Sequence, residues 1–317
     1  MRTFLPRPGR IVLALLLSLP LALQVASSQA RERLLWLVQD LPPFTIFEGP
    51  QSGQGVVDHL LPRLIERLPE YDHSVIRVNR ARGLQMLQDK TFACDPALLW
   101  TPERARYIHF SKPFLKVVSS GLVLRRQDRL LVEPFLRGSQ VDLSRLMTEI
   151  HLKLGIVARR SYSAQVDHIL RGLPEDSVSR HYGNDATASL LQMQALGRVQ
   201  LVLGYWPEIG YLIQRQGGSL DTYMFYPVSG VAPYQFMHVG CSDTALGREA
   251  LEHIDRVLPS LRRAGLRERY ARWLPPKQRA HYLERAAYLI EEKAEEPSIT
   301  VPDRQKETPA AGEDDRG

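Results

Sequence analysis

Short apolar runs that alternate with amphipathic stretches constrain the fold of this chain more than any other feature. Runs such as Arg33–Gln39, Leu154–Ala158 and Val199–Gly204 have the length of buried strands. Stretches such as Arg80–Gln88 and Ala186–Leu196 repeat apolar residues at helical spacing. Strands that alternate with helices predict an α/β fold, in which mostly parallel sheets are flanked by helices on both faces.

The first thirty residues have the pattern of a secretory signal peptide. Basic residues precede an apolar run, Ile11–Val25, and small residues lead up to Ala30. The run is short for a membrane span, although an uncleaved anchor is the alternative. We expect cleavage after Ala30 and an exported, periplasmic protein. At the other end, residues 291–317 are polar and acidic, and their composition predicts a disordered tail.

Charge and motifs exclude several classes of function. The net charge is +6, but export and the lack of a dense basic run with aromatics argue against a nucleic-acid partner. The sequence has no P-loop, no G-x-S-x-G and no H-E-x-x-H motif. We therefore predict a binding protein and not an enzyme, with no cofactor and no metal.

Two cysteines, Cys94 and Cys241, are the only ones in the chain. In an oxidising compartment an even count favours a disulfide. Two buried free thiols are the alternative. A metal site would need more ligands than two cysteines this far apart offer.

The segment Thr101-Pro102-Glu103-Arg104 has the pattern of a helix start. Threonine is a good N-cap and proline is favoured at the first helical position, so we expect a helix from Pro102. Its free backbone N–H groups and the Arg104 guanidinium together suit a carboxylate. The alternative is a capped surface helix whose arginine is solvated.

Ligands of parallel α/β sheets bind where strands end and βα loops begin. Three such loops stand out, namely Asp40–Phe44, Arg159–Ser163 and Tyr205–Glu208. Each candidate in or near them has an alternative role in packing, capping or a turn. The candidate ligand-binding residues, besides Arg104 and Thr101, are Asp40, Phe44, Trp100, Ser161, Tyr162, Ser163, Tyr205 and Glu208.

The stretch Thr101–Phe114, which reads TPER and then FSKPF, follows a strand, a Pro-Pro-Phe and a glycine-rich turn. This order resembles the bacterial periplasmic solute-binding proteins of family 3, which have the type II periplasmic-binding fold. The resemblance runs from about Leu35 to Trp273. It implies that the Thr-x-x-Arg element binds the carboxylate of a ligand, with Arg104 as the main anchor.

The resemblance also implies two lobes joined by two hinge crossings. Lobe 1 would be residues 31–121 plus 236–290, and lobe 2 would be residues 122–235. Both cysteines then belong to lobe 1, which implies that they pair. Amino-acid binders usually place an acid for the ligand's ammonium where this chain has Tyr205. The ligand is therefore expected to be a small molecule with a carboxylate, and not an amino acid in particular.

The implied function is that of a monomeric periplasmic binding protein. It would capture its ligand in the interlobe cleft, close like a Venus flytrap, and present itself to an ABC permease or a membrane sensor. One alternative is a dehydratase-type enzyme on the same fold, with Glu208 or Asp40 as its acid. Another is an orphan sensory protein with a degenerate cleft.

Overall fold

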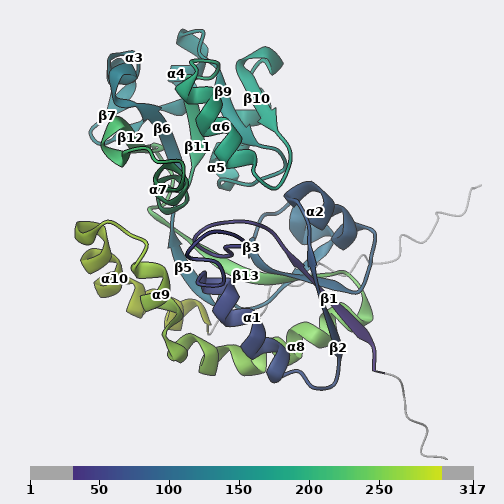
Figure 1. The fold of residues 1–317 in the computed structure, drawn as a ribbon. Coiled ribbons are helices and arrows are strands. Elements are labelled where there is room, and N and C mark those ends of the chain that lie inside the picture. The colour runs from purple at the N-terminus through teal and green to yellow at the C-terminus, as the bar shows by residue number, and fades with distance from the viewer. Residues whose placement is uncertain (1–30, 295–317) are drawn as a thin grey trace, which may run out of the picture. The chain divides into compact units, whose positions relative to one another are not determined.

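A computed structural model describes residues 31–294, with side chains up to residue 285 (Figure 1). The predicted signal peptide and most of the predicted acidic tail lie outside the described residues. The last helix runs to Ala294, so residues 291–294 are helical and the predicted tail begins too early. None of the helices that the structure describes combines the length and apolarity of a membrane span.

One sheet has six strands in the order β2-β1-β3-β13-β4, with β5 also paired to β13. Strands β2 and β3 run parallel to β1, whereas β3, β4 and β5 all pair with β13 in antiparallel fashion. Its strands are β1 (Arg33–Val38), β2 (Asp72–Arg77), β3 (Ala93–Leu99), β4 (Ile108–Phe110), β5 (Leu115–Val118) and β13 (Tyr234–Ser242).

A second sheet has five strands in the order β10-β9-β11-β6-β12. Strands β10 and β11 run parallel to β9, and β6 is antiparallel to both β11 and β12. Its strands are β6 (Gly121–Arg125), β9 (Leu154–Val157), β10 (Val178–His181), β11 (Leu201–Gly204) and β12 (Tyr223–Pro227). A two-stranded hairpin, β7 (Leu136–Arg137) and β8 (Gln140–Val141), accompanies it.

Both sheets are mostly parallel, as the sequence predicts, because five of the six strands in the first sheet and four of the five in the second run in one direction. In each sheet three neighbouring strands pair in parallel, β2-β1-β3 and β10-β9-β11, because a helix carries the chain back between them. One strand in each sheet runs in the opposite direction, β13 in the first and β6 in the second, and β13 enters the first sheet after the chain has built the second. Apolar runs do not record strand direction, so the sequence could not show which strands run in the opposite direction.

Helices bury both faces of each sheet. In β1, Leu34, Trp36 and Val38 join one core and Leu37 joins another, as the two-residue period of a strand requires. The helices beside the first sheet are α1 (Val56–Glu66), α2 (Arg80–Gln88), α8 (Ala245–Leu261), α9 (Arg267–Ala271) and α10 (Pro276–Ala294). Those beside the second are α3 (Arg129–Val132), α4 (Leu143–Glu149), α5 (Ala164–Gly172), α6 (Ala186–Ala195) and α7 (Trp206–Arg215).

Side-chain caps set the starts of several helices. The Asn79 side chain accepts the Arg82 N–H, so α2 begins directly after β2. Thr244 accepts the Gly247 N–H at the start of α8, and Ser163 accepts the Val166 N–H at the start of α5. The predicted helix at Pro102 does not form. Residues 104–106 make one 3-10 turn, because β4 begins at Ile108 and leaves no room for an α-helix.

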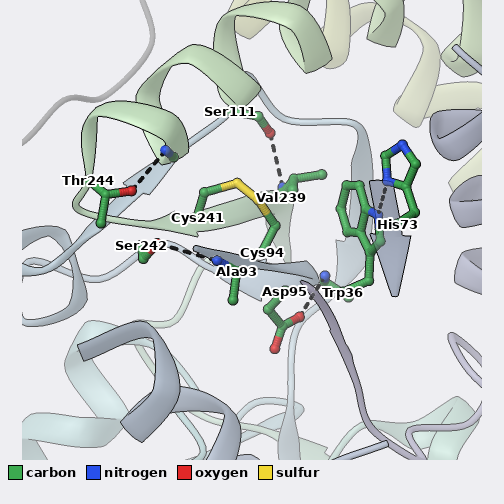
Figure 2. The surroundings of a disulfide bond; sticks show 12 residues. Trp36, His73, Ala93, Cys94, Asp95, Ser111, Val239, Cys241, Ser242 and Thr244 are labelled. Atoms are coloured by element: carbon green, nitrogen blue, oxygen red, sulfur yellow. Dashed lines mark hydrogen bonds between the residues drawn. A yellow bond between two sulfur atoms is a disulfide. The ribbon is translucent and has the colours of Figure 1, made fainter. Parts of the chain in front are cut away.

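A disulfide joins Cys94 on β3 to Cys241 on β13, which confirms the predicted bridge (Figure 2). The two residues are direct partners in the antiparallel register, and both are fully buried. The bridge lies inside a network of polar contacts, in which Ser242 accepts the Ala93 N–H and Ser111 accepts the Val239 N–H. It links strands that are 147 residues apart in the chain.

Candidate ligand site

A cavity of about 40 Å³ lies where strands of both sheets end. This volume holds a few water molecules and no larger ligand. Its wall combines residues that follow β1, β2, β9 and β10 with one face of α7. The charged residues that line it are Asp40, Arg80, Arg160, Asp185, Glu208 and Arg215. The carboxyl ends of parallel strands thus meet at one site, as ligand-binding α/β sheets require.

Arg160 and Glu208 form a buried, bidentate ion pair in this wall. The two guanidinium N–H groups of Arg160 donate to the carboxylate of Glu208 at 2.7 and 3.0 Å. The Thr187 hydroxyl donates to the same carboxylate at 2.8 Å. Burial is the largest single effect and lowers the pKa of Arg160. The Glu208 carboxylate together with Tyr162 and Tyr205 outweighs burial, so the net shift of this pKa is upward. Glu208 therefore already has a cation and a hydroxyl as partners, and no ligand ammonium is needed to neutralise it.

Arg80 has fewer hydrogen-bond partners than Arg160. Its guanidinium lies 3.6 Å from the buried carboxylate of Asp95, which also accepts hydrogen bonds from Gln39 and the Ala97 N–H. Its Nε is buried and has no hydrogen-bond partner among the described residues. Burial lowers the pKa of Arg80 to about 10, and the positive charges of Arg104 and Arg160 act in the same direction. Three guanidinium groups thus repel one another beside the cavity.

Arg104 is only 5% exposed, and its guanidinium donates to two backbone carbonyls. One is that of Leu99 at 3.0 Å, and the other is that of Arg159 at 3.2 Å. No carboxylate of the described residues forms a salt bridge with it, although Asp95 and Asp167 act on it at longer range. A buried cation that meets only neutral acceptors retains attraction for an anion.

Thr101 and Tyr205 are the other candidate residues in and around the Thr-x-x-Arg element. The Thr101 hydroxyl accepts the Arg104 N–H at 3.1 Å, so its predicted capping contact exists around a turn instead of a helix. Tyr205 is buried, and burial raises its pKa to about 12. The charges of Arg160, Arg80 and Arg104 oppose this shift. Neither Arg104, Thr101 nor Tyr205 lines the cavity.

The predicted anion cradle at Ser161, Tyr162 and Ser163 is filled by the protein itself. The Asp167 carboxylate accepts the Ser161 hydroxyl at 2.5 Å and the Tyr162 N–H at 2.9 Å. Ser163 caps α5, and the Tyr162 ring is completely buried in the core of the second sheet. Because a side chain of the same helix takes these donors, an external anion has no access to them in this structure.

The two aromatic candidates also lie away from the cavity. Phe44 packs in the core of the first sheet and stacks on Tyr270, with ring centroids 5.6 Å apart. Trp100 is 37% exposed and does not line the cavity. Of the ten residues proposed from the sequence, the structure brings Asp40 and Glu208 to the cavity wall.

Sequence reasoning missed Arg80, Asp95 and Thr187 as parts of this site. A signal was available for Arg80, because it directly follows a predicted strand and the capping residue Asn79. The rule that places ligands at the carboxyl ends of strands applies to it as much as to Asp40. No local pattern marks Thr187, whose role comes from a contact with Glu208 across 21 residues.

Asp40 and Asp185 are the two acids of the wall that form no ion pair among the described contacts, and of the two Asp40 is partly buried whereas Asp185 is exposed. The Asp40 carboxylate accepts the Phe47 N–H at 3.3 Å. Burial raises its pKa above the usual value of about 3.9, since desolvation disfavours the charged form. The folded state therefore binds this proton more tightly than the unfolded state does. Stability is lost as the pH rises through the raised pKa and the carboxylate ionises.

We expect Asp40→Asn to raise the melting temperature at pH 7, because the amide keeps an acceptor for the Phe47 N–H and removes a buried charge. The gain should shrink towards pH 3.5, where the wild-type carboxyl is also neutral. Thermal unfolding followed by circular dichroism at both pH values measures it. The exposed Asp176→Asn is the matched control. A variant that is less stable than wild type at pH 7 would contradict this account.

No family model matches the sequence. No curated protein matches it either.

Solved structures, in contrast, resemble this one over most of the chain. A histidine kinase sensor domain with similarity to periplasmic binding proteins has a TM-score of 0.59 at 17% identity, over 77% of this chain and 96% of that one. An ABC uptake transporter substrate-binding protein from Streptococcus pneumoniae with bound histidine has a TM-score of 0.58 at 15% identity, over 77% of this chain and 92% of that one. An ancestral arginine-binding protein bound to arginine has a TM-score of 0.57 at 16% identity, over 77% of this chain and 99% of that one. The chain therefore has the type II periplasmic-binding-protein fold.

Proposed function

We propose that this protein is an exported solute-binding protein that captures a small ligand through its carboxylate. One observation carries the proposal, namely that the guanidinium groups of Arg80 and Arg104 are both largely buried and repel each other, and that neither meets a carboxylate at hydrogen-bond distance among the described residues. Arg80 Nε has no acceptor among the described residues, and Arg104 meets only carbonyls. A ligand carboxylate would supply both the acceptor oxygens and the negative charge.

The fold supports the same role. The similar structures are a substrate-binding protein of an ABC transporter, an arginine-binding protein and a sensor domain. We propose lobe 1 as residues 31–121 plus 236–290 and lobe 2 as residues 122–235, with the cavity as the ligand cleft. Since about 40 Å³ is too small for such a ligand, its entry requires the cavity to widen. The partner would be an ABC permease or a membrane sensor, and the protein would act as a monomer.

Arg104→Gln should weaken binding of a stabilising carboxylate about 10- to 100-fold, because a charge-assisted hydrogen bond contributes roughly 1.5–3 kcal/mol. A thermal-shift screen of amino acids, dicarboxylates and peptidoglycan fragments would first find that ligand, and titration of wild type and variant would then measure the change. Arg129→Gln, which removes an exposed arginine paired only with Glu133, is the control and should bind like wild type. Equal affinity of Arg104→Gln and wild type would refute the role of Arg104.

A dehydratase-type enzyme is the second candidate, and Asp40 is the residue that favours it. Asp40 lines the cavity, and its raised pKa keeps more of the carboxyl protonated, as a general acid requires. Glu208 is a poorer choice, since its carboxylate already accepts from Arg160 and Thr187. Proton NMR of the stabilising carboxylate after long incubation separates the two functions. Unchanged ligand supports binding, whereas a product that Asp40→Asn fails to form supports the enzyme.

A further inference from the structure

A second cavity, of about 260 Å³, lies apart from the first. Both connections between the two sheets contribute to it, through Ser119 and Ser120 on one side and Val231, Ala232 and Pro233 on the other. Helix α10, which runs beside β5 and α9 in Figure 1, supplies another part of the wall. It shares no lining residue with the candidate ligand site.

The wall of this cavity is largely apolar and aromatic. Trp206 and Phe225 stand together in it, with ring centroids 5.5 Å apart, and Tyr234 lies on the same wall. Aromatic walls of this kind are typical of small-molecule sites, because rings bury much apolar area at little entropic cost. The volume fits the apolar part of a small ligand.

The one charged side chain of the cavity wall, among the described residues, is a cation. His281 and Arg285 line the cavity from α10, and no Asp or Glu does. Behind Tyr234 lies Lys116, whose ammonium stands 4.1 Å from the centre of the Tyr234 ring. Lys116 is 1% exposed, and its Nζ has no hydrogen-bond partner among the described residues.

Lys116 and Arg285 are close enough to affect each other. Burial lowers the pKa of Lys116, and the positive charge of Arg285 lowers it further. A buried ammonium without an acceptor is unfavourable, and the Tyr234 ring compensates it only in part. A second cation at short range adds to this cost, whereas an anion between the two would remove it.

We propose that this cavity is a second ligand site, for a small monocarboxylate with an apolar body. The carboxylate would pair with Arg285, near His281 and Lys116, and the apolar body would lie against Trp206 and Phe225. The site is independent of the proposed function of the first cavity, since the two share no residue.

Octanoate is a suitable probe, with octanol and octylamine as its neutral and cationic counterparts. Isothermal titration calorimetry, below micelle-forming concentrations, should show octanoate binding at one site per chain and much weaker binding of the other two compounds. Arg285→Gln should weaken octanoate about tenfold. Lys277→Gln removes an exposed charge from the same helix outside the cavity wall, and should change nothing.

Arg104→Gln distinguishes the two cavities, because it should leave octanoate binding intact while affecting the first site. Three results of the titrations with octanoate, octanol and the Arg285→Gln variant would overturn the proposal. They are the absence of saturable octanoate binding, equal affinity for octanol, and equal affinity of the Arg285→Gln variant. Loss of octanoate binding in Arg104→Gln would assign octanoate to the first cavity and would overturn it as well.

Discussion

Replacing both cysteines with alanine should lower the free energy of unfolding by about 2–5 kcal/mol. The disulfide closes a loop of 147 residues, so its removal frees a large part of the unfolded chain. The chain-entropy model gives roughly 5 kcal/mol for such a loop, and measured effects are usually smaller. Urea unfolding of wild type and of Cys94→Ala/Cys241→Ala measures the difference.

The single variants make this test sharper. If the cross-link itself stabilises the fold, Cys94→Ala and Cys241→Ala each remove all of it, and each should be nearly as destabilised as the double variant. Wild type unfolded with a reducing agent should match them. Two small and additive losses would show that the side chains matter only through packing.

The second large effect is expected at the Arg160–Glu208 ion pair. Arg160→Met leaves the Glu208 carboxylate buried with Thr187 as its one described donor, which should cost about 3–5 kcal/mol. Because the cost comes from the unpaired charge and not from the missing attraction, Arg160→Met/Glu208→Leu should recover most of it. Denaturant unfolding of both variants completes the comparison.

An exposed ion pair supplies the control. Arg129 and Glu133 on and after α3 are both solvent-exposed, and Arg129→Met should cost about 1 kcal/mol or less. A double variant that is less stable than Arg160→Met alone would show that the buried pair contributes favourably in its own right. The interpretation of Glu208 as a structural acid would still stand, but the desolvation argument would be wrong.

Local features of the fold were predictable from the sequence. Helix α2 has the predicted bounds, Arg80–Gln88, because apolar spacing and the Asn79 cap both act within a few residues. The stretch at Pro102 shows the limit of the same reasoning. Its capping contact forms as predicted, but β3 ends at Leu99 and β4 begins at Ile108, so tertiary structure shortens the helix to a turn.

The loops that form the site were predictable from the sequence, but the contacts between their side chains were not. The three βα loops proposed from the sequence each contribute a residue to the cavity, namely Asp40, Arg160 and Glu208. Their partners were not predictable, since Arg160 and Glu208 are 48 residues apart and Arg104 reaches a carbonyl 55 residues away. Charge pairing across such separations depends on how the sheets are placed, which no local pattern encodes.

The two carbonyl acceptors of Arg104 have a consequence for selectivity. A ligand that pairs with the Nη1–H and Nη2–H groups that donate to these carbonyls does so by exchange, in which oxygens of the ligand replace the oxygens of Leu99 and Arg159. For a neutral amide or alcohol the exchange gives one hydrogen bond for another and little net free energy. For a carboxylate it replaces a neutral acceptor by a charged one. The two backbone carbonyls thus compete with the ligand for Arg104, and this competition disfavours uncharged solutes.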